Sequence, residues 1–204
     1  SKPGEVELKI MARAATRRDA ARMARRVEAA IRRKFGDKVY GTGDATLSSA
    51  VGALLRKNKK TLSVAESCTG GLLSAALTDT PGSSDFLKGS IVCYANGVKI
   101  GLLGVSKKLL GSRGAVSEET ALQMAVNVRE KFNTDYGIGV TGIAGPGGGS
   151  KKKPVGLVYI ALAGRRFSLC QQNRLIGSRA EIRNRTVHKA LDLLRLVISK
   201  PRAA

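Results

Sequence analysis

The chain has 204 residues, and its 36 Lys and Arg against 15 Asp and Glu give a formal net charge of +21 at pH 7. This length fits one main domain with room for a small second one. No apolar run approaches the ~20 residues of a membrane-spanning helix, and no apolar segment typical of a secretory signal lies near the start. The three cysteines lack metal-ligand spacing, so we expect reduced thiols in a cytoplasmic protein.

The surplus positive charge indicates either a polyanionic partner such as nucleic acid or a generally basic surface. The charge is spread along most of the chain, which favours the basic surface. Aromatic residues make up only 4% of the chain, so side chains on which single-stranded bases stack are scarce. A nucleic-acid partner is therefore kept as the alternative interpretation of the charge.

The first 43 residues predict a small β-α-β piece. Residues 6–12 alternate apolar and polar like a half-buried strand, residues 16–34 carry an apolar stripe at helical spacing, and residues 38–40 begin a second strand. Thr16 followed by Asp19 resembles a capping box. A piece of this size is too small to be stable alone, so we expect it to dock on another surface. Its many arginines make it the best candidate for a nucleic-acid face, although a solvated helix is favoured.

Residues 44–204 predict the main domain, in which strands and helices mostly alternate. We expect helices at 46–58, 72–77, 117–132 and 178–198, a short helical segment at 95–100, buried strands at 62–65 and 90–94, a strand at 136–140, and a hairpin of strands at 155–163 and 167–175. This pattern predicts a three-layer α/β/α domain with a mixed sheet.

The stretch from residue 61 to 71 reads Thr-Leu-Ser-Val-Ala-Glu-Ser-Cys-Thr-Gly-Gly. It predicts a strand that turns sharply into a helix through small polar residues and two glycines. The hydroxyl groups of Ser67 and Thr69 then lie beside unpaired helix N–H groups, which is typical of an anion site or of an exposed, activated serine. The alternative is an ordinary helix N-cap with glycine for tight packing.

Polar groups also follow two other predicted strands. Tyr94 and Lys99 come after residues 90–94, and Thr141 precedes a glycine-rich loop at 142–149. Ligands of layered α/β folds bind where strand ends open, so convergence of these ends would make one site. Glycines let backbone N–H groups approach a phosphate closely. The loop lacks the Gly-Lys-Ser/Thr ending of a P-loop, so we expect neither magnesium nor any cofactor.

A serine nucleophile needs a base, and the sequence offers two choices. The single histidine, His188, lies in the middle of a predicted helix, which disfavours a Ser-His-Asp triad. Lys99 is the better candidate, because desolvation or cationic neighbours lower the pKa of a lysine enough for it to take a proton. Cys68 is the rival nucleophile, but a buried free cysteine is usually inert.

Four motifs in order resemble one family: Ala-Glu-Ser-Cys-Thr-Gly-Gly at 65–71, Tyr-Ala-Asn-Gly-Val-Lys at 94–99, Gly-Val-Thr-Gly-Ile-Ala-Gly-Pro at 139–146 and Lys-Pro-Val-Gly at 153–156. The family is the C-terminal domain of the competence-damage inducible protein CinA, also found alone as nicotinamide mononucleotide deamidase. Residues 3–43 resemble the second half of its KH-like middle domain. The nucleotide-pyrophosphatase-like domain of full-length CinA has no counterpart here, so the chain is either a fragment or a gene product without that domain.

The resemblance implies hydrolysis of the carboxamide of nicotinamide mononucleotide to nicotinic acid mononucleotide and ammonia, a step of pyridine nucleotide salvage. Ser67 would attack, Lys99 would take its proton, and Tyr94 would relay or orient it, while N–H groups near Thr69 and Gly70 would stabilise the oxyanion. Substrate contacts would come from Thr69, Gly70, Asn96, Thr141, Gly142, Gly145, Gly147 and Arg179, with Arg183 as the alternative phosphate ligand. The family also implies a homodimer.

Two departures from the family pattern bear on activity. Gly97, and Lys151 with Lys152, stand where the family commonly has acidic residues. They could alter affinity or the pKa of Lys99. The alternative hypothesis is a basic nucleic-acid-binding or assembly module without catalytic activity, with the arginines between residues 17 and 26 gripping phosphates.

Overall fold

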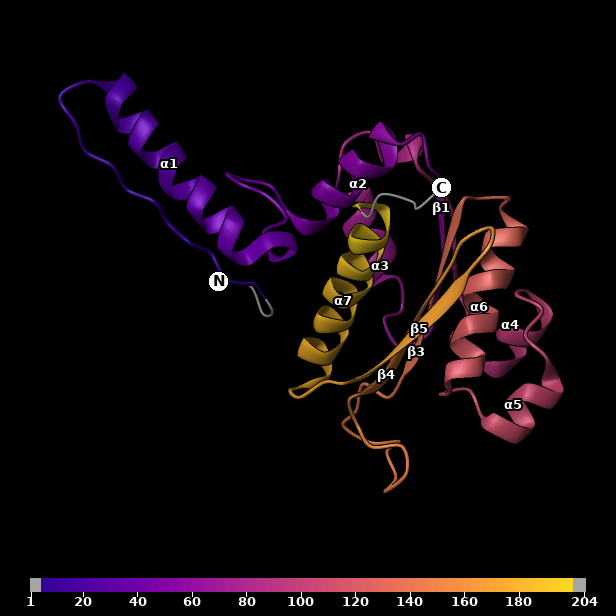
Figure 1. Cartoon of the computed structure of the whole chain (residues 1–204). Coiled ribbons are helices and arrows are strands. Elements are labelled where there is room, and N and C mark those ends of the chain that lie inside the picture. The colour runs from indigo at the N-terminus through magenta and orange to yellow at the C-terminus, as the bar shows by residue number, and fades with distance from the viewer. Residues whose placement is uncertain (1–4, 200–204) are drawn as a thin grey trace. The chain divides into compact units, whose positions relative to one another are not determined.

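The computed structural model describes residues 5–199, and the chain divides into two compact units between Ala45 and Thr46 (Figure 1). The boundary predicted after residue 43 lies two residues away. Because the two units are separate bodies, each is described by itself.

The first unit is built on one long helix, α1 (Arg17–Phe35), followed by a 3-10 turn, η1 (Gly36–Lys38). The hydroxyl of Thr16 accepts the Asp19 N–H at 3.1 Å and donates to the Asp19 carboxylate at 2.7 Å. The Asp19 side chain thus accepts a hydrogen bond from the side chain of the cap residue. In a full capping box it would accept one from the backbone N–H of the cap residue instead. Gly36, with a φ of +52°, ends the helix. The helix predicted at 16–34 is confirmed.

The two strands expected on either side of α1 are absent from the described residues. Residues 6–12 and 38–40 pair with no strand, and Val6 and Met11 are 86% and 84% exposed. A strand is stable only where a neighbour bonds its N–H and C=O groups, and no sheet lies in this unit as described. The Tyr40 hydroxyl instead donates to Glu5, and burial, together with this contact, raises the pKa of Tyr40 to about 12.

The second unit contains a five-stranded mixed sheet in the order β2-β1-β3-β4-β5. β1 pairs in parallel with β2 and β3, whereas β4 runs antiparallel to both β3 and β5. The strands are β1 (Leu62–Glu66), β2 (Leu87–Val92), β3 (Tyr136–Gly142), β4 (Leu157–Ala163) and β5 (Ser168–Arg174). The predicted mixed sheet is confirmed.

Helices cover both faces of this sheet, as the three-layer prediction requires (Figure 1). One layer contains α2 (Leu47–Lys57), α3 (Leu72–Thr78) and α7 (Arg179–Ser199), and the other contains α4 (Asn96–Gly101), α5 (Lys107–Arg113) and α6 (Glu118–Lys131), while a 3-10 turn, η2 (Ser83–Asp85), precedes β2. Helix α6 packs on β1, β3, β4 and β5. Among the described residues, no helix is both long and apolar enough to cross a membrane.

Glycines in β3 let α6 approach the sheet closely. A Cβ at Gly137 would lie 2.2 Å from the Ala125 carbonyl oxygen, and one at Gly139 would lie 2.4 Å from that of Ala121. Distances this short exclude any side chain at either position. The close packing fixes the end of β3 relative to α6.

The sequence predicts a buried strand at residues 90–94, but part of this segment is exposed. β2 is an edge strand that pairs only with β1, so its side chains alternate between covered and open positions. Val92 is 47% exposed and Tyr94, just beyond the strand, is 59% exposed. The polar end of this strand is therefore open to solvent beside the fully buried β1.

Candidate active site

The carboxyl ends of β1, β2 and β3 lie at one edge of the sheet. Glu66, the last residue of β1, is opposite Val92 of β2 and Val140 of β3. The ladder continues one step beyond the strand, because Ser67 N–H donates to the Val140 carbonyl at 3.0 Å and Cys93 N–H donates to the Glu66 carbonyl at 2.8 Å. These bonds hold the turn that starts with Ser67 between its two neighbouring strands.

Lys99 reaches this turn from the first turns of α4. Its side chain is buried, with 1% exposure, and its Nζ donates to Ser67 Oγ at 3.0 Å. The same Nζ donates to the Cys93 carbonyl at 2.7 Å and the Tyr94 carbonyl at 3.1 Å. Burial disfavours the charged ammonium and lowers the pKa of Lys99 below its ordinary value.

The geometry around Lys99 suits a neutral amine that accepts a proton. When Nζ has only two protons, the Cys93 and Tyr94 carbonyls bond both of them. The remaining lone pair of the tetrahedral nitrogen then points at the third neighbour, Ser67 Oγ. A serine hydroxyl that faces such a lone pair can donate its proton as it attacks.

The two rival groups are placed differently. Cys68 is buried, and burial raises the pKa of its thiol to about 11, so little thiolate forms at neutral pH. His188 lies half-buried on α7. Ser67 is thus the candidate nucleophile whose hydroxyl contacts a base.

Tyr94 contacts the Ser67–Lys99 pair through its backbone carbonyl. Its phenol oxygen instead accepts a hydrogen bond from Arg179 Nη2 at 3.1 Å. Arg179 Nη1 donates to the Gly145 carbonyl at 2.8 Å. The exposed Arg179 of α7 therefore joins the end of β2 to the glycine-rich loop.

Arg183, one turn further along α7, lies over the Ser67 turn. Its Nη2 donates to the Thr69 carbonyl at 2.7 Å, and a Cβ at Gly70 would lie 3.3 Å from this nitrogen. Two buried polar atoms at this contact, Thr69 Oγ1 and Arg183 Nε, have no hydrogen-bond partner among the described residues. Arg179 and Arg183 thus place two guanidinium groups at different parts of one edge.

Glu66 holds the start of α3 next to Ser67, a role that sequence analysis did not predict. Its side chain is fully buried and accepts the N–H groups of Gly71 at 3.1 Å, Leu73 at 3.0 Å and Ser74 at 2.8 Å, as well as the Ser74 hydroxyl. The anion that binds the start of α3 is therefore the carboxylate of the protein itself. An acidic residue next to a Ser-x-Thr-Gly-Gly turn was the available signal.

The remaining predicted site residues fall into two groups. Thr141 is buried and its hydroxyl donates to the Ala115 carbonyl at 2.7 Å, and Gly142 packs against Val158, 2.7 Å from where its Cβ would lie. These two residues hold the end of β3 in place. Asn96 and Gly147 are exposed, and no atom lies within 4 Å of where a Cβ at Gly147 would be.

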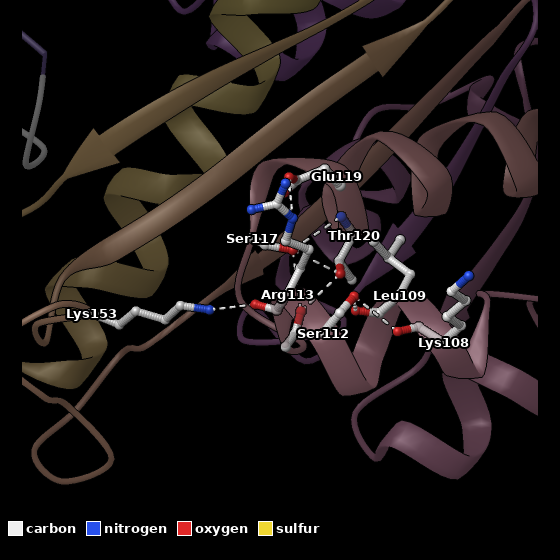
Figure 2. Close-up of polar contacts among 9 residues, drawn as sticks. Lys108, Leu109, Ser112, Arg113, Ser117, Glu119, Thr120 and Lys153 are labelled. Atoms are coloured by element: carbon white, nitrogen blue, oxygen red, sulfur yellow. Dashed lines mark hydrogen bonds and ion pairs between the residues drawn. The ribbon is translucent and has the colours of Figure 1, made fainter.

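Polar contacts hold the turn between α5 and α6, and Lys153 reaches this turn from the chain segment that follows the glycine-rich loop, as Figure 2 shows. Lys153 Nζ donates to the Arg113 carbonyl at 2.6 Å. The hydroxyls of Ser117 and Thr120 donate to the Gly114 carbonyl at 3.2 and 2.9 Å. Because the Thr141 hydroxyl bonds the Ala115 carbonyl, the three successive carbonyls of residues 113–115 each accept a side-chain hydrogen bond. No cluster of three metal-ligating side chains occurs within residues 5–199.

Two family models match the chain. The model of the CinA C-terminal domain matches residues 44–198, and that of the damage-inducible protein CinA KH domain matches residues 1–41. The second match is consistent with a KH-like fragment in the first unit.

Named relatives agree with these matches. A putative competence-damage inducible protein of Moorella thermoacetica is 47% identical over 95% of this chain and 47% of its own length. A CinA-like protein of Dictyoglomus thermophilum is 48% identical over 96% of this chain and 47% of its own length. The chain thus spans about half the length of the curated relatives it matches.

Solved structures agree in fold. The competence/damage inducible protein CihA of Agrobacterium tumefaciens is 38% identical, with a TM-score of 0.71 over 78% of this chain and 100% of that one. A CinA superfamily protein of Klebsiella pneumoniae is 29% identical, with a TM-score of 0.73 over 75% of this chain and 96% of that one. The chain therefore belongs to the CinA family.

Proposed function

We propose that the second unit hydrolyses the carboxamide of nicotinamide mononucleotide to nicotinic acid mononucleotide and ammonia. The observation that carries this proposal is the 3.0 Å contact between Lys99 Nζ and Ser67 Oγ in a buried setting. A hydroxyl paired with a neutral amine is a nucleophile of the type that cleaves amides by way of an acyl-enzyme. The family membership and the four sequence motifs support this choice of substrate.

The reaction proceeds in two balanced steps. Ser67 Oγ attacks the amide carbon, and the hydroxyl proton passes to Lys99. The resulting Lys99 ammonium then protonates the amide nitrogen and the C–N bond breaks. Ammonia departs, and the acyl group remains bound to Ser67 as an ester. In the second step Lys99 takes a proton from water, which attacks the ester. The C–O bond to Ser67 breaks and the proton returns to Ser67 Oγ, releasing the acid.

The oxyanion formed in each step requires donors near Ser67. Gly70 N–H already donates to the Ser67 carbonyl at 3.1 Å. No backbone acceptor for the Thr69 N–H lies among the described residues, so Thr69 is the better of the two predicted donors. One well-placed donor of this type contributes about 3 kcal/mol to the transition state.

The phosphate of the substrate requires cationic ligands at the same edge. Arg179 and Arg183 supply two guanidinium groups, of which Arg179 is exposed. Guanidinium groups bind phosphate oxygens in bidentate fashion. The α3 N-terminus is not available for this role because Glu66 occupies it. Of the predicted substrate contacts, Arg179 is the first to test.

Ammonia release from nicotinamide mononucleotide by the full chain tests the proposal. We expect Ser67→Ala to lower kcat by at least about 10³-fold, while Cys68→Ala retains activity because the buried thiol takes no part. Circular dichroism of both variants checks that the fold is intact. Activity retained in Ser67→Ala would refute the nucleophile, and no ammonia from the wild-type chain would refute the substrate.

A further inference from the structure

One side of α1 carries a row of arginines, which we call the α1 arginine face. It consists of Arg18, Arg22, Arg25, Arg26, Arg32 and Arg33. Successive helical residues are separated by about 100°, so these six side chains occupy roughly one third of the circumference. All six are exposed.

The acidic residues of α1 leave most of this face uncompensated. Arg22 pairs with Asp19 at 2.9 Å and Arg32 pairs with Glu28 at 2.8 Å, and both acids lie at the borders of the face. Within residues 5–199 no acidic side chain forms an ion pair with Arg18, Arg25, Arg26 or Arg33.

Like charges at these spacings oppose helix formation. Arginines three or four residues apart repel one another by a few tenths of a kcal/mol per pair. Arg22 and Arg32 gain from their ion pairs, and Arg32 and Arg33 gain from the helix dipole at the last turn. Arg18, Arg25 and Arg26 gain from neither. A partner that supplies negative charge along the row would remove the repulsion and gain charge-assisted hydrogen bonds.

The opposite side of α1 is partly packed within the unit. Ala20, Ala24 and Ile31 lie on that side and are half-buried, whereas Met23 and Val27 beside them are 50% and 48% exposed. The arginines of the α1 arginine face lie outside this packing, and four of them form no ion pair among the described residues.

The dimensions of the face match a nucleic-acid duplex. Arg18 and Arg33 are 15 positions apart, which at 1.5 Å per residue is about 22 Å along the axis. A duplex carries one phosphate charge per ~1.7 Å, so about a dozen phosphates lie along this length. The major groove of B-DNA, about 12 Å wide, admits an α-helix. Seven of the eight basic residues of α1 are arginine, the side chain that best matches phosphate oxygens.

We propose that the α1 arginine face binds the phosphate backbone of duplex nucleic acid without sequence preference, a function separate from the amide hydrolysis proposed for the second unit. The other side of α1 carries Met23, Val27, Ile31 and Phe35 beside its alanines, so an anionic membrane surface is the competing partner, and binding to phosphatidylserine vesicles distinguishes it from the duplex. Single strands fit less well because Phe35 is the one aromatic side chain of α1.

Fluorescence anisotropy with the full chain and a labelled duplex of about 20 base pairs, once as DNA and once as RNA, tests this proposal. The test variant is Arg18→Gln/Arg25→Gln/Arg33→Gln, which breaks none of the ion pairs of α1. The matched control is Lys107→Gln/Lys131→Gln/Lys189→Gln, three exposed positions on helices of the second unit. Both variants lose three positive charges, and glutamine is a good helix former.

We expect the slope of log affinity against log salt to fall by about 3 in the α1 variant. At ~0.1 M salt its affinity falls by roughly 100-fold or more, whereas the control loses much less. This result on either duplex supports the proposal, and the two duplexes identify the source of the phosphates. Equal losses in both variants, no binding by the wild-type chain, or a larger loss on phosphatidylserine vesicles than on the duplexes would overturn it.

Discussion

Lys99 Nζ lies 3.0 Å from Ser67 Oγ, and its other two hydrogen bonds go to the main-chain carbonyls of Cys93 and Tyr94. No carboxylate among the described residues forms an ion pair with this buried amine. Its environment therefore stabilises the ammonium less than water does. This relationship determines how both activity and stability respond to pH.

The first prediction concerns the pH dependence of catalysis. Because the proposed reaction uses neutral Lys99 as its base, kcat/KM should rise with pH and level off above the lowered pKa of Lys99. Lys99→Arg keeps the side chain charged at all accessible pH values and should lower kcat/KM by at least about 10³-fold. Lys107→Arg, at an exposed position, is the matched control. A rate profile that does not change with pH in the wild-type chain would contradict the assignment.

The second prediction concerns stability. The unfolded chain holds a proton on Lys99 up to its ordinary pKa of 10.5, whereas the folded chain releases it at a lower pH. Between these two pKa values the unfolded state binds more protons, so the free energy of unfolding contributed by Lys99 rises with pH. Below the lowered pKa, the cost of the buried charge is fully present. Lys99→Met removes this cost.

Urea denaturation of the wild-type chain and Lys99→Met at a series of pH values measures the effect. Met should raise the free energy of unfolding most at low pH, and its advantage should shrink as the pH rises through the lowered pKa of Lys99. An advantage that grows with pH would have the wrong sign and would show that the lysine is stabilised in its charged form.

The third prediction concerns Glu66. Glu66→Gln places an NH₂ group against N–H donors that now share a carboxylate, so we expect a loss of about 2–3 kcal/mol in the free energy of unfolding. Ser67 follows directly, so activity should fall as well. Glu181→Gln is the control, because Glu181 also bonds a helix-capping N–H, that of Ser178, but in an exposed position. Equal losses in the two variants would mean that burial of Glu66 is not what matters.

The fourth prediction concerns the contact between Lys153 and Arg113. Lys153→Met removes the hydrogen bond that ties the segment after the glycine-rich loop to the end of α5. Amide hydrogen exchange in residues 143–156 should become faster, and KM for nicotinamide mononucleotide should rise several-fold with a smaller change in kcat. Lys151→Met, at an exposed position in the same segment, should change neither. Unchanged exchange in Lys153→Met would show that other contacts hold the loop.

The elements around the site could be predicted because each has a local cause. The apolar run before Ser67 and the stripe from Ala121 to Phe132 define a strand and a helix without reference to the rest of the fold. Polar residues directly after such strands, such as Thr141, then mark the edge where a site opens. The sequence could therefore bring Ser67 and Lys99 to one edge, but not to a specific distance.

What could not be predicted depends on partners distant in the chain. Burial of residues 90–94 depends on the sheet order, which makes β2 an edge strand. The role of Glu66 depends on a turn that carries the N–H groups of residues 71–74 back onto its carboxylate. Helix α5 has only seven residues, too few to show a clear helical period. Its local signals are Ser106, whose hydroxyl accepts the Leu109 N–H at 3.3 Å, and Gly114, with a φ of +81°, at its end.

The antiparallel β4 and β5 have a practical consequence for experiments. The turn that joins them lies beside the start of β3, because the end of β4 pairs with the start of β3 and with the start of β5. Ser67 lies near the other end of β3, so the turn is at the opposite edge of the sheet. Arg165 and Arg166 in this turn are exposed. A fluorophore or a surface anchor attached between them would report on the second unit while the edge that carries Ser67 stays uncovered.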